Sequence, residues 1–108
     1  MADGMKRVEY VSPLGFDGRR RIRHERVGGK VVRFMVQYEI FVEGQWHPVV
    51  RYNNSHGFAH RDLMHPDGRK EKTDLLSKDL NICLTFAEND LRANWTDYRR
   101  RFLKEVEK

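Results

Sequence analysis

Residues 30–43 show the clearest alternation of apolar and polar positions in this chain of 108 residues. Six apolar side chains occupy every second position: Val32, Phe34, Val36, Tyr38, Ile40 and Val42. Successive side chains of a strand point to opposite faces, so this period predicts a strand with one face toward a core. At about 3.3 Å per residue the strand would run about 40 Å, and we expect a strong twist or a bulge along it.

Strands are also predicted on both sides of this segment. The pairs Gly28-Gly29 and Glu43-Gly44 favour tight hairpins, because glycine adopts positive φ without strain. They join the central strand to predicted strands at 19–27 and 45–53. Residues 58–65 and 69–73 are predicted as further strands, separated by the turn sequence Pro66-Asp67-Gly68.

The strand at 45–53 is predicted to place Trp46, Val50 and Tyr52 on one face. Pro48 lies within it and cannot donate a hydrogen bond to a neighbouring strand, so we expect it at an edge, at a bulge, or with its nitrogen facing away from a partner strand.

The last third of the chain has the period of an amphipathic helix. Apolar side chains recur every three or four residues: Leu80, Leu84, Ala87, Leu91, Trp95, Tyr98, Phe102 and Val106. They predict a helix over 77–107 with Ser77 as its N-cap, although Thr96 could begin a second helix. We expect Trp95 and Phe102 to pack against the strand face that carries Val32, Phe34 and Val36. A partner helix is the alternative for the far end of the stripe.

These elements predict an α+β fold, an antiparallel β-meander of four to six strands packed on one face by a long C-terminal α-helix. The length fits a single domain over 1–108. Residues 1–18 are interpreted as a partly mobile lead, in which Val8, Tyr10 and Val11 could add an edge strand. Residues 19–73 would form the sheet.

Composition indicates a cytoplasmic protein with no membrane segment. No apolar run approaches the roughly 18 residues of a membrane helix, and the N-terminus lacks the apolar core of a signal peptide. The single cysteine, Cys83, cannot form an internal disulfide and is predicted to be a buried, inert thiol.

The net charge of +5 and the pI near 9.6 favour anionic partners, although this charge is also usual for solubility alone. The run Arg19-Arg20-Arg21 would lie on a strand. There it could contact phosphates, or it could protect a sheet edge from pairing with other chains.

Residues 51–68 hold the densest cluster of chemically active side chains. Three histidines, His56, His60 and His65, could bind zinc with Asp62 or His47 as a fourth ligand. On a strand, however, His60 and His65 would point to opposite faces, so we expect no metal site and no cofactor.

The same segment could perform acid–base chemistry on RNA without a metal. Cleavage through the 2′-hydroxyl needs a base and an acid, for which His56 and His60 are suited. Asp62 could orient a histidine and Tyr52 could donate a proton. The candidate nucleic-acid-binding residues are Arg51, Arg61, Arg19, Arg20 and Arg21.

We expect His56, His60, Arg51 and Arg61 to line one shallow cationic site at the end of the sheet. A polar sheet face with satisfied cross-strand pairs is the alternative interpretation of these residues.

The sequence VVRYNNSHGFAHRDLMHPDG, followed by a charged strand and a helix with RANWTDYRRRF, resembles a group of small uncharacterised prokaryotic proteins. These share an RYD-x-x-HG-x-x-HRD-x-x-HPDG segment and an NW-x-x-Y-x-x-x-F helix. The resemblance covers roughly residues 31–102, and Asn53 stands where the group has aspartate. In layout the segment is also similar to the TumE-like toxins of toxin–antitoxin pairs.

The resemblance implies a toxin–antitoxin-like component acting on RNA or binding it, with a cognate antitoxin-like protein as a partner. One form of this function is a metal-independent ribonuclease. A non-enzymatic basic module that binds an acidic protein or nucleic acid is a second interpretation, and a structural domain is a third. An unpaired long strand and a long helix also favour a homodimer.

Overall fold

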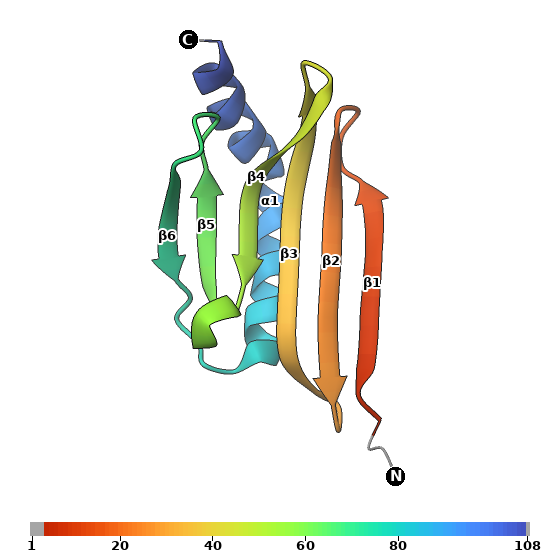
Figure 1. Cartoon of the computed structure of the whole chain (residues 1–108). Helices are drawn as coiled ribbons and strands as arrows, with labels where there is room; N and C mark the ends of the chain where they lie inside the picture. The colour runs from red at the N-terminus through yellow and green to blue at the C-terminus, as the bar shows by residue number, and fades with distance from the viewer. Residues whose placement is uncertain (1–3, 108) are drawn as a thin grey trace.

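The computed structural model describes residues 4–107 and shows a six-stranded antiparallel sheet with one long helix behind it (Figure 1). The strands are neighbours in chain order, so the sheet is a meander and the predicted α+β fold is confirmed. The elements are β1 (Lys6–Pro13), β2 (Gly18–Val27), β3 (Lys30–Val42), β4 (Gln45–Asn53), η1 (Ser55–Gly57), β5 (His60–Met64), β6 (Lys70–Asp74) and α1 (Leu80–Val106).

The first strand lies within the segment interpreted as a partly mobile lead. Residues 6–13 form β1, which pairs with β2 from Lys6 opposite Arg26 to Pro13 opposite Arg19. The apolar positions in this stretch therefore do add an edge strand. Residues 1–3 of the predicted lead lie outside the described residues.

The predicted turns are confirmed. Gly28 and Gly29 have φ of 55° and 79°, and Glu43 and Gly44 have φ of 52° and 80°. Two successive residues with positive φ give a hairpin the twist of its strands. Between β5 and β6, the amide of Gly68 donates to the carbonyl oxygen of His65 at 3.0 Å.

The long central strand β3 contains an expected bulge and β4 contains a second, and the two overturn two predicted side-chain directions. The pairing of β2 with β3 shifts beside Val32, so Val31 is buried and Val32 is 45% exposed. The pairing of β3 with β4 shifts beside Val49, next to Pro48, as expected for a proline in a strand. Beyond that bulge the alternation of β4 changes phase, and Trp46 lies on the face opposite Val50.

The helix begins at Leu80, three residues later than predicted. Its N-cap is Asp79 and not Ser77, because the Asp79 carboxylate accepts hydrogen bonds from the amides of Asn81 at 2.9 Å and Ile82 at 3.4 Å. The helix is continuous to Val106, so Thr96 does not cap a second helix. It packs chiefly against β3 and then β4.

Phe102 is buried as predicted, with 1% of its surface exposed, but its neighbours differ from the prediction. Its ring lies 6.1 Å from the ring of His47. The predicted partner Val32 is at the other end of the sheet, near the start of the helix, where Asn81 accepts a hydrogen bond from the amide of Val31. Trp95 is only partly buried. It meets the ring of Tyr38 edge-on at 6.2 Å.

Cys83 is buried on α1, as predicted, and its thiol donates to the carbonyl oxygen of Ser77 at 3.2 Å. Burial raises the pKa of this thiol, which disfavours the reactive thiolate. Among the residues described, no helix combines the length and apolarity that crossing a membrane requires.

Candidate nucleic-acid interface on the open sheet face

The two faces of the sheet differ in what covers them. The helix packs on the face that carries Phe34, Val36, Tyr38 and Ile40. Figure 1 views the sheet from the other side, which we call the open face, with α1 behind it. Strand pairing places mostly polar side chains there, among them Arg19, Arg21, Arg23, Arg33, Gln37, Glu39, Phe41, Trp46, Arg51, Asn53, His60, Asp62, Lys70, Lys72 and Asp74, together with the apolar Met35 and Met64.

A hydrogen-bonded network crosses the centre of the open face from β2 to β4. Glu39 accepts from Arg19 Nε at 2.5 Å, and Arg21 Nε lies 3.9 Å from its other oxygen. Gln37 donates to Glu39 and accepts from Arg51 Nε at 2.5 Å. Glu39 is therefore neutralised within the sheet, and it holds the surrounding guanidinium groups in place.

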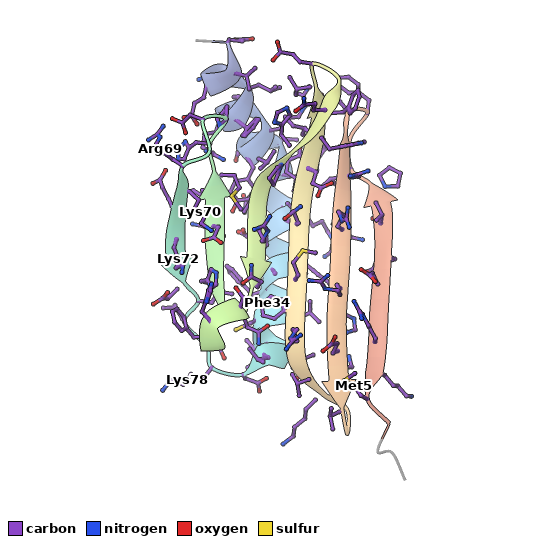
Figure 2. All side chains as sticks on the ribbon, viewed as in Figure 1. Met5, Phe34, Arg69, Lys70, Lys72 and Lys78 are labelled. Carbon is purple, nitrogen blue, oxygen red and sulfur yellow. The ribbon has the colours of Figure 1, made fainter. Side chains whose placement is uncertain are left out.

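The centre of the open face is also hollowed. A depression of about 750 Å³ lies across β2, β3, β4 and η1. Its charged lining consists of Arg21, Arg23, Arg33, Arg51 and Glu39. Four arginines against one glutamate give the hollow an excess of positive charge. Figure 2 shows that further cations, Lys70 and Lys72, lie along the β6 edge of the sheet.

The predicted site residues His56 and His60 are placed differently with respect to the hollow. His56 lies on η1 with φ of 71°, is exposed and lines the hollow. His60 is only 1% exposed and is not part of the lining. Its Nδ1 donates to the carbonyl oxygen of Phe58 at 3.2 Å, and its Nε2 lies 3.5 Å from Oδ2 of Asp62. Asp62 is buried too, so His60 and Asp62 form a covered pair beneath the surface.

Arg61 and Tyr52 lie on the helix-covered face, so the prediction that Arg61 joins His60 and Arg51 in one site is wrong. Arg61 follows His60 in a regular strand and therefore points the opposite way. Its guanidinium donates to the Tyr98 hydroxyl at 3.1 Å. Tyr52 is fully buried, and its hydroxyl donates to Asp90 at 2.5 Å. Burial is the main cause of its raised pKa, which disfavours proton release.

The run Arg19-Arg20-Arg21 is divided between the two faces. Arg19 and Arg21 belong to the network around Glu39. Arg20 pairs in register with Tyr38 and therefore points to the helix side of the sheet. The guanidinium of Arg20 lies 6.0 Å from the centroid of the Tyr10 ring. Only two arginines of the run therefore belong to the open face.

The three histidines considered as metal ligands, His56, His60 and His65, have separate positions and different partners. His65 is on the helix side, with Nδ1 2.8 Å from Glu105 and Nε2 2.6 Å from Glu71. His60 is paired with Asp62 on the other face. Within residues 4–107, no group of three or more histidine, cysteine, aspartate or glutamate side chains is arranged to hold a metal ion.

Comparison with known proteins gives a family but no assigned activity. No curated protein and no solved structure matches the sequence. Residues 5–108 match a family described as a domain of unknown function, DUF7718. The chain belongs to the DUF7718 family. The expectation of an uncharacterised domain family is thereby confirmed, and the similarity to TumE-like toxins stays a prediction.

Several residues of the DUF7718 open face were absent from the sequence-based candidates. Arg23 and Arg33 line the hollow, and Gln37 and Glu39 hold its arginines. The period of two contained part of this signal, because Arg19, Arg21 and Arg23 must share one face of β2. The same period places Arg33, Gln37 and Glu39 on one face of β3, since the bulge at Val32 begins only on the other side of Arg33.

Proposed function

We propose that this DUF7718 protein binds RNA through the open face of its sheet. The observation that carries the proposal is the hollow of about 750 Å³, whose charged lining is four arginines and one glutamate. An RNA-binding component is also what the resemblance to toxin–antitoxin proteins implies.

Arginine suits a phosphate ligand because its planar guanidinium offers five N–H donors and can bind two oxygens at once. The contacts of Arg19 and Arg51 in the network use their Nε–H groups. Their Nη groups make no hydrogen bond to another of the described side chains, so these donors remain for a ligand. Because Glu39 and Gln37 already hold the guanidinium groups, less side-chain freedom is lost when phosphate binds.

The arrangement of the arginines favours a polymer with repeated phosphates. They come from three neighbouring strands, with Arg21 and Arg23 on β2, Arg33 on β3 and Arg51 on β4. A single small anion would meet only part of this set. An acidic protein is the other polymeric anion that the face could bind, and it is separated from RNA by competition below.

The geometry supports binding better than cleavage. A general acid or base must come within hydrogen-bond reach of its proton. His56 is exposed at the hollow, but His60 is buried with Asp62. The two imidazoles therefore do not meet one phosphodiester on this surface.

The proposal is tested by fluorescence anisotropy with labelled RNA and two matched double variants. Arg21→Gln/Arg23→Gln removes two charges from the open face, and Arg20→Gln/Arg100→Gln removes two charges elsewhere. Arg20 faces the helix side, and Arg100 is exposed on α1 beside Asp97. We expect the first pair to weaken RNA binding by about tenfold or more, because hydrogen bonds to charged groups are lost. The second pair should bind nearly as wild type does.

Three results would contradict the proposal. One is no binding of RNA by the wild-type protein, and another is an equal loss of affinity in both double variants. The third is displacement of RNA by polyglutamate at equal charge, which would indicate an acidic protein as the ligand. Cleavage of the labelled RNA that disappears in both His56→Asn and His60→Gln would support a ribonuclease instead.

A further inference from the structure

Two exposed aromatic side chains lie on the open face beside the arginine network. Phe41 and Trp46 are cross-strand partners on β3 and β4, and they are 47% and 40% exposed. Their rings meet edge-on with centroids 5.2 Å apart. The guanidinium of Arg19 lies 3.9 Å from the Trp46 ring centroid, so this pair adjoins the Glu39 network directly. We call Phe41, Trp46 and Arg19 the aromatic platform.

The position of this platform does not follow from the needs of the core. The bulge beside Val49 changes the phase of β4, so Trp46 faces away from the helix while Val49 and Val50 are both buried. A large aromatic side chain on an uncovered polar face gains little from packing, and it is the residue type on which nucleic-acid bases stack.

We propose that the open face binds single-stranded RNA in preference to duplex RNA, with bases stacked on the aromatic platform. This inference rests on the proposed RNA binding and specifies its ligand. In a duplex the base faces are already stacked on one another, so only an unpaired strand can offer them to Phe41 and Trp46. The sugar-phosphate backbone of that strand would follow the arginines of the hollow.

The face is long enough for several nucleotides. The hollow ends at η1, where Asn54 accepts a hydrogen bond from the amide of Phe34 on β3. The platform lies at Phe41 on the same strand. Seven residue steps of about 3.3 Å separate these positions along β3, or about 23 Å. That length fits the smaller single-strand sites, of about four nucleotides.

The chain has two tryptophans, one on each side of the sheet, which allows the platform to be observed directly. Trp95 packs against Tyr38 on the helix side. The variant Trp95→Phe therefore leaves Trp46 as the only tryptophan fluorophore. A mixed-sequence RNA strand of about ten nucleotides is titrated in, and then the same strand annealed to its complement. We expect the single strand to quench Trp46 and the duplex to leave its emission nearly unchanged.

The affinities are measured by anisotropy on the otherwise wild-type chain. We expect Trp46→Ala to weaken single-strand binding by about tenfold, and Trp46→Phe to retain most of it because phenylalanine also stacks. Circular dichroism checks that each variant keeps its fold. Since Trp46 is well exposed, both substitutions should be tolerated.

Failure of this inference and failure of the proposed function give different results. Duplex binding as tight as single-strand binding, lost in Arg21→Gln/Arg23→Gln but unchanged in Trp46→Ala, would overturn the stacking inference and leave RNA binding in place. A single strand that binds without quenching Trp46 would also overturn it. Binding of neither RNA form would overturn the proposed function and, with it, this inference.

Discussion

At the scale of single residues, Asp90 connects the helix to the sheet through one carboxylate. Its Oδ2 accepts from the hydroxyls of Tyr52 and Tyr98, each at 2.5 Å, and its Oδ1 accepts from Asn94 at 2.9 Å. Burial is the first cause of the raised pKa of both tyrosines, and the bond to Asp90 adds to it. The hydroxyls therefore act as fixed donors within the core.

We predict that Asp90→Ala destabilises the protein by roughly 1–3 kcal/mol for each buried hydroxyl that it leaves without an acceptor. Asp90→Asn should cost less, because the amide oxygen can still accept. The free energy of unfolding is measured in urea. Asp97→Ala is the control on the same helix, since Asp97 is exposed and pairs only with Arg100 within the described chain. Equal stability of Asp90→Ala and Asp97→Ala would show that Asp90 is not structural.

His65 joins the end of the helix to the β5–β6 hairpin between two carboxylates. Hydrogen bonds to Glu105, and secondly to Glu71, raise the pKa of His65 above its ordinary value. The same contact lowers the pKa of Glu105. A raised folded-state pKa means that the interaction stabilises the fold fully below the unfolded pKa of about 6.5, and that this stability is lost as the pH rises through the folded pKa.

We predict that His65→Asn reduces stability most near pH 6 and less as the pH is raised above neutrality. Urea unfolding of wild type and variant across this pH series gives the difference directly. Glu105→Gln should flatten the same part of the wild-type profile, because it removes the partner of the charged imidazole. A stability difference that stays constant over the series would show that the charge of His65 contributes nothing.

At the scale of elements, the far end of α1 depends on Phe102. Its side chain is fully buried beside His47, in the first half of β4. We predict that Phe102→Ala lowers the free energy of unfolding by roughly 3–5 kcal/mol, because it removes buried surface and leaves a cavity. Thermal and urea unfolding measure the loss.

Phe86 provides a matched control on the same helix, since it is 45% exposed. Phe86→Ala should change stability much less than Phe102→Ala. If the two substitutions had equal effects, the helix end would not be packed as the structure places it.

Alternation predicted most elements but failed where the strand pairing shifts. The period of two in β3 correctly identified Phe34, Val36, Tyr38 and Ile40 as core. It misplaced Val32 and Trp46, because a bulge adds one residue and reverses every side chain beyond it. A bulge is set by packing between strands, and a single-strand pattern does not contain it.

At the scale of the whole molecule, the open face exists because one helix covers only one side of the sheet. From the period of two alone, Arg19, Arg21 and Arg51 could be predicted to lie on strands with polar faces. Their convergence on Glu39 could not, since it depends on the register among β2, β3 and β4. The buried state of His60 was also hidden, because it depends on the strands on both sides of β5, where His60 pairs with Asn53 and Asp74.

The distribution of charge over the two faces leads to a prediction about salt. Each phosphate neutralised by a cation on a single strand contributes about −0.7 to the slope of log affinity against log salt concentration. We predict that Arg23→Gln lowers the magnitude of this slope by about 0.7, while Arg20→Gln leaves it unchanged, since Arg20 faces the helix side. Trp46→Ala should weaken binding at every salt concentration with the wild-type slope, because stacking releases no counterions. Equal slopes for Arg23→Gln and Arg20→Gln would mean that RNA responds to the net charge of +5 as a whole and does not bind at the open face.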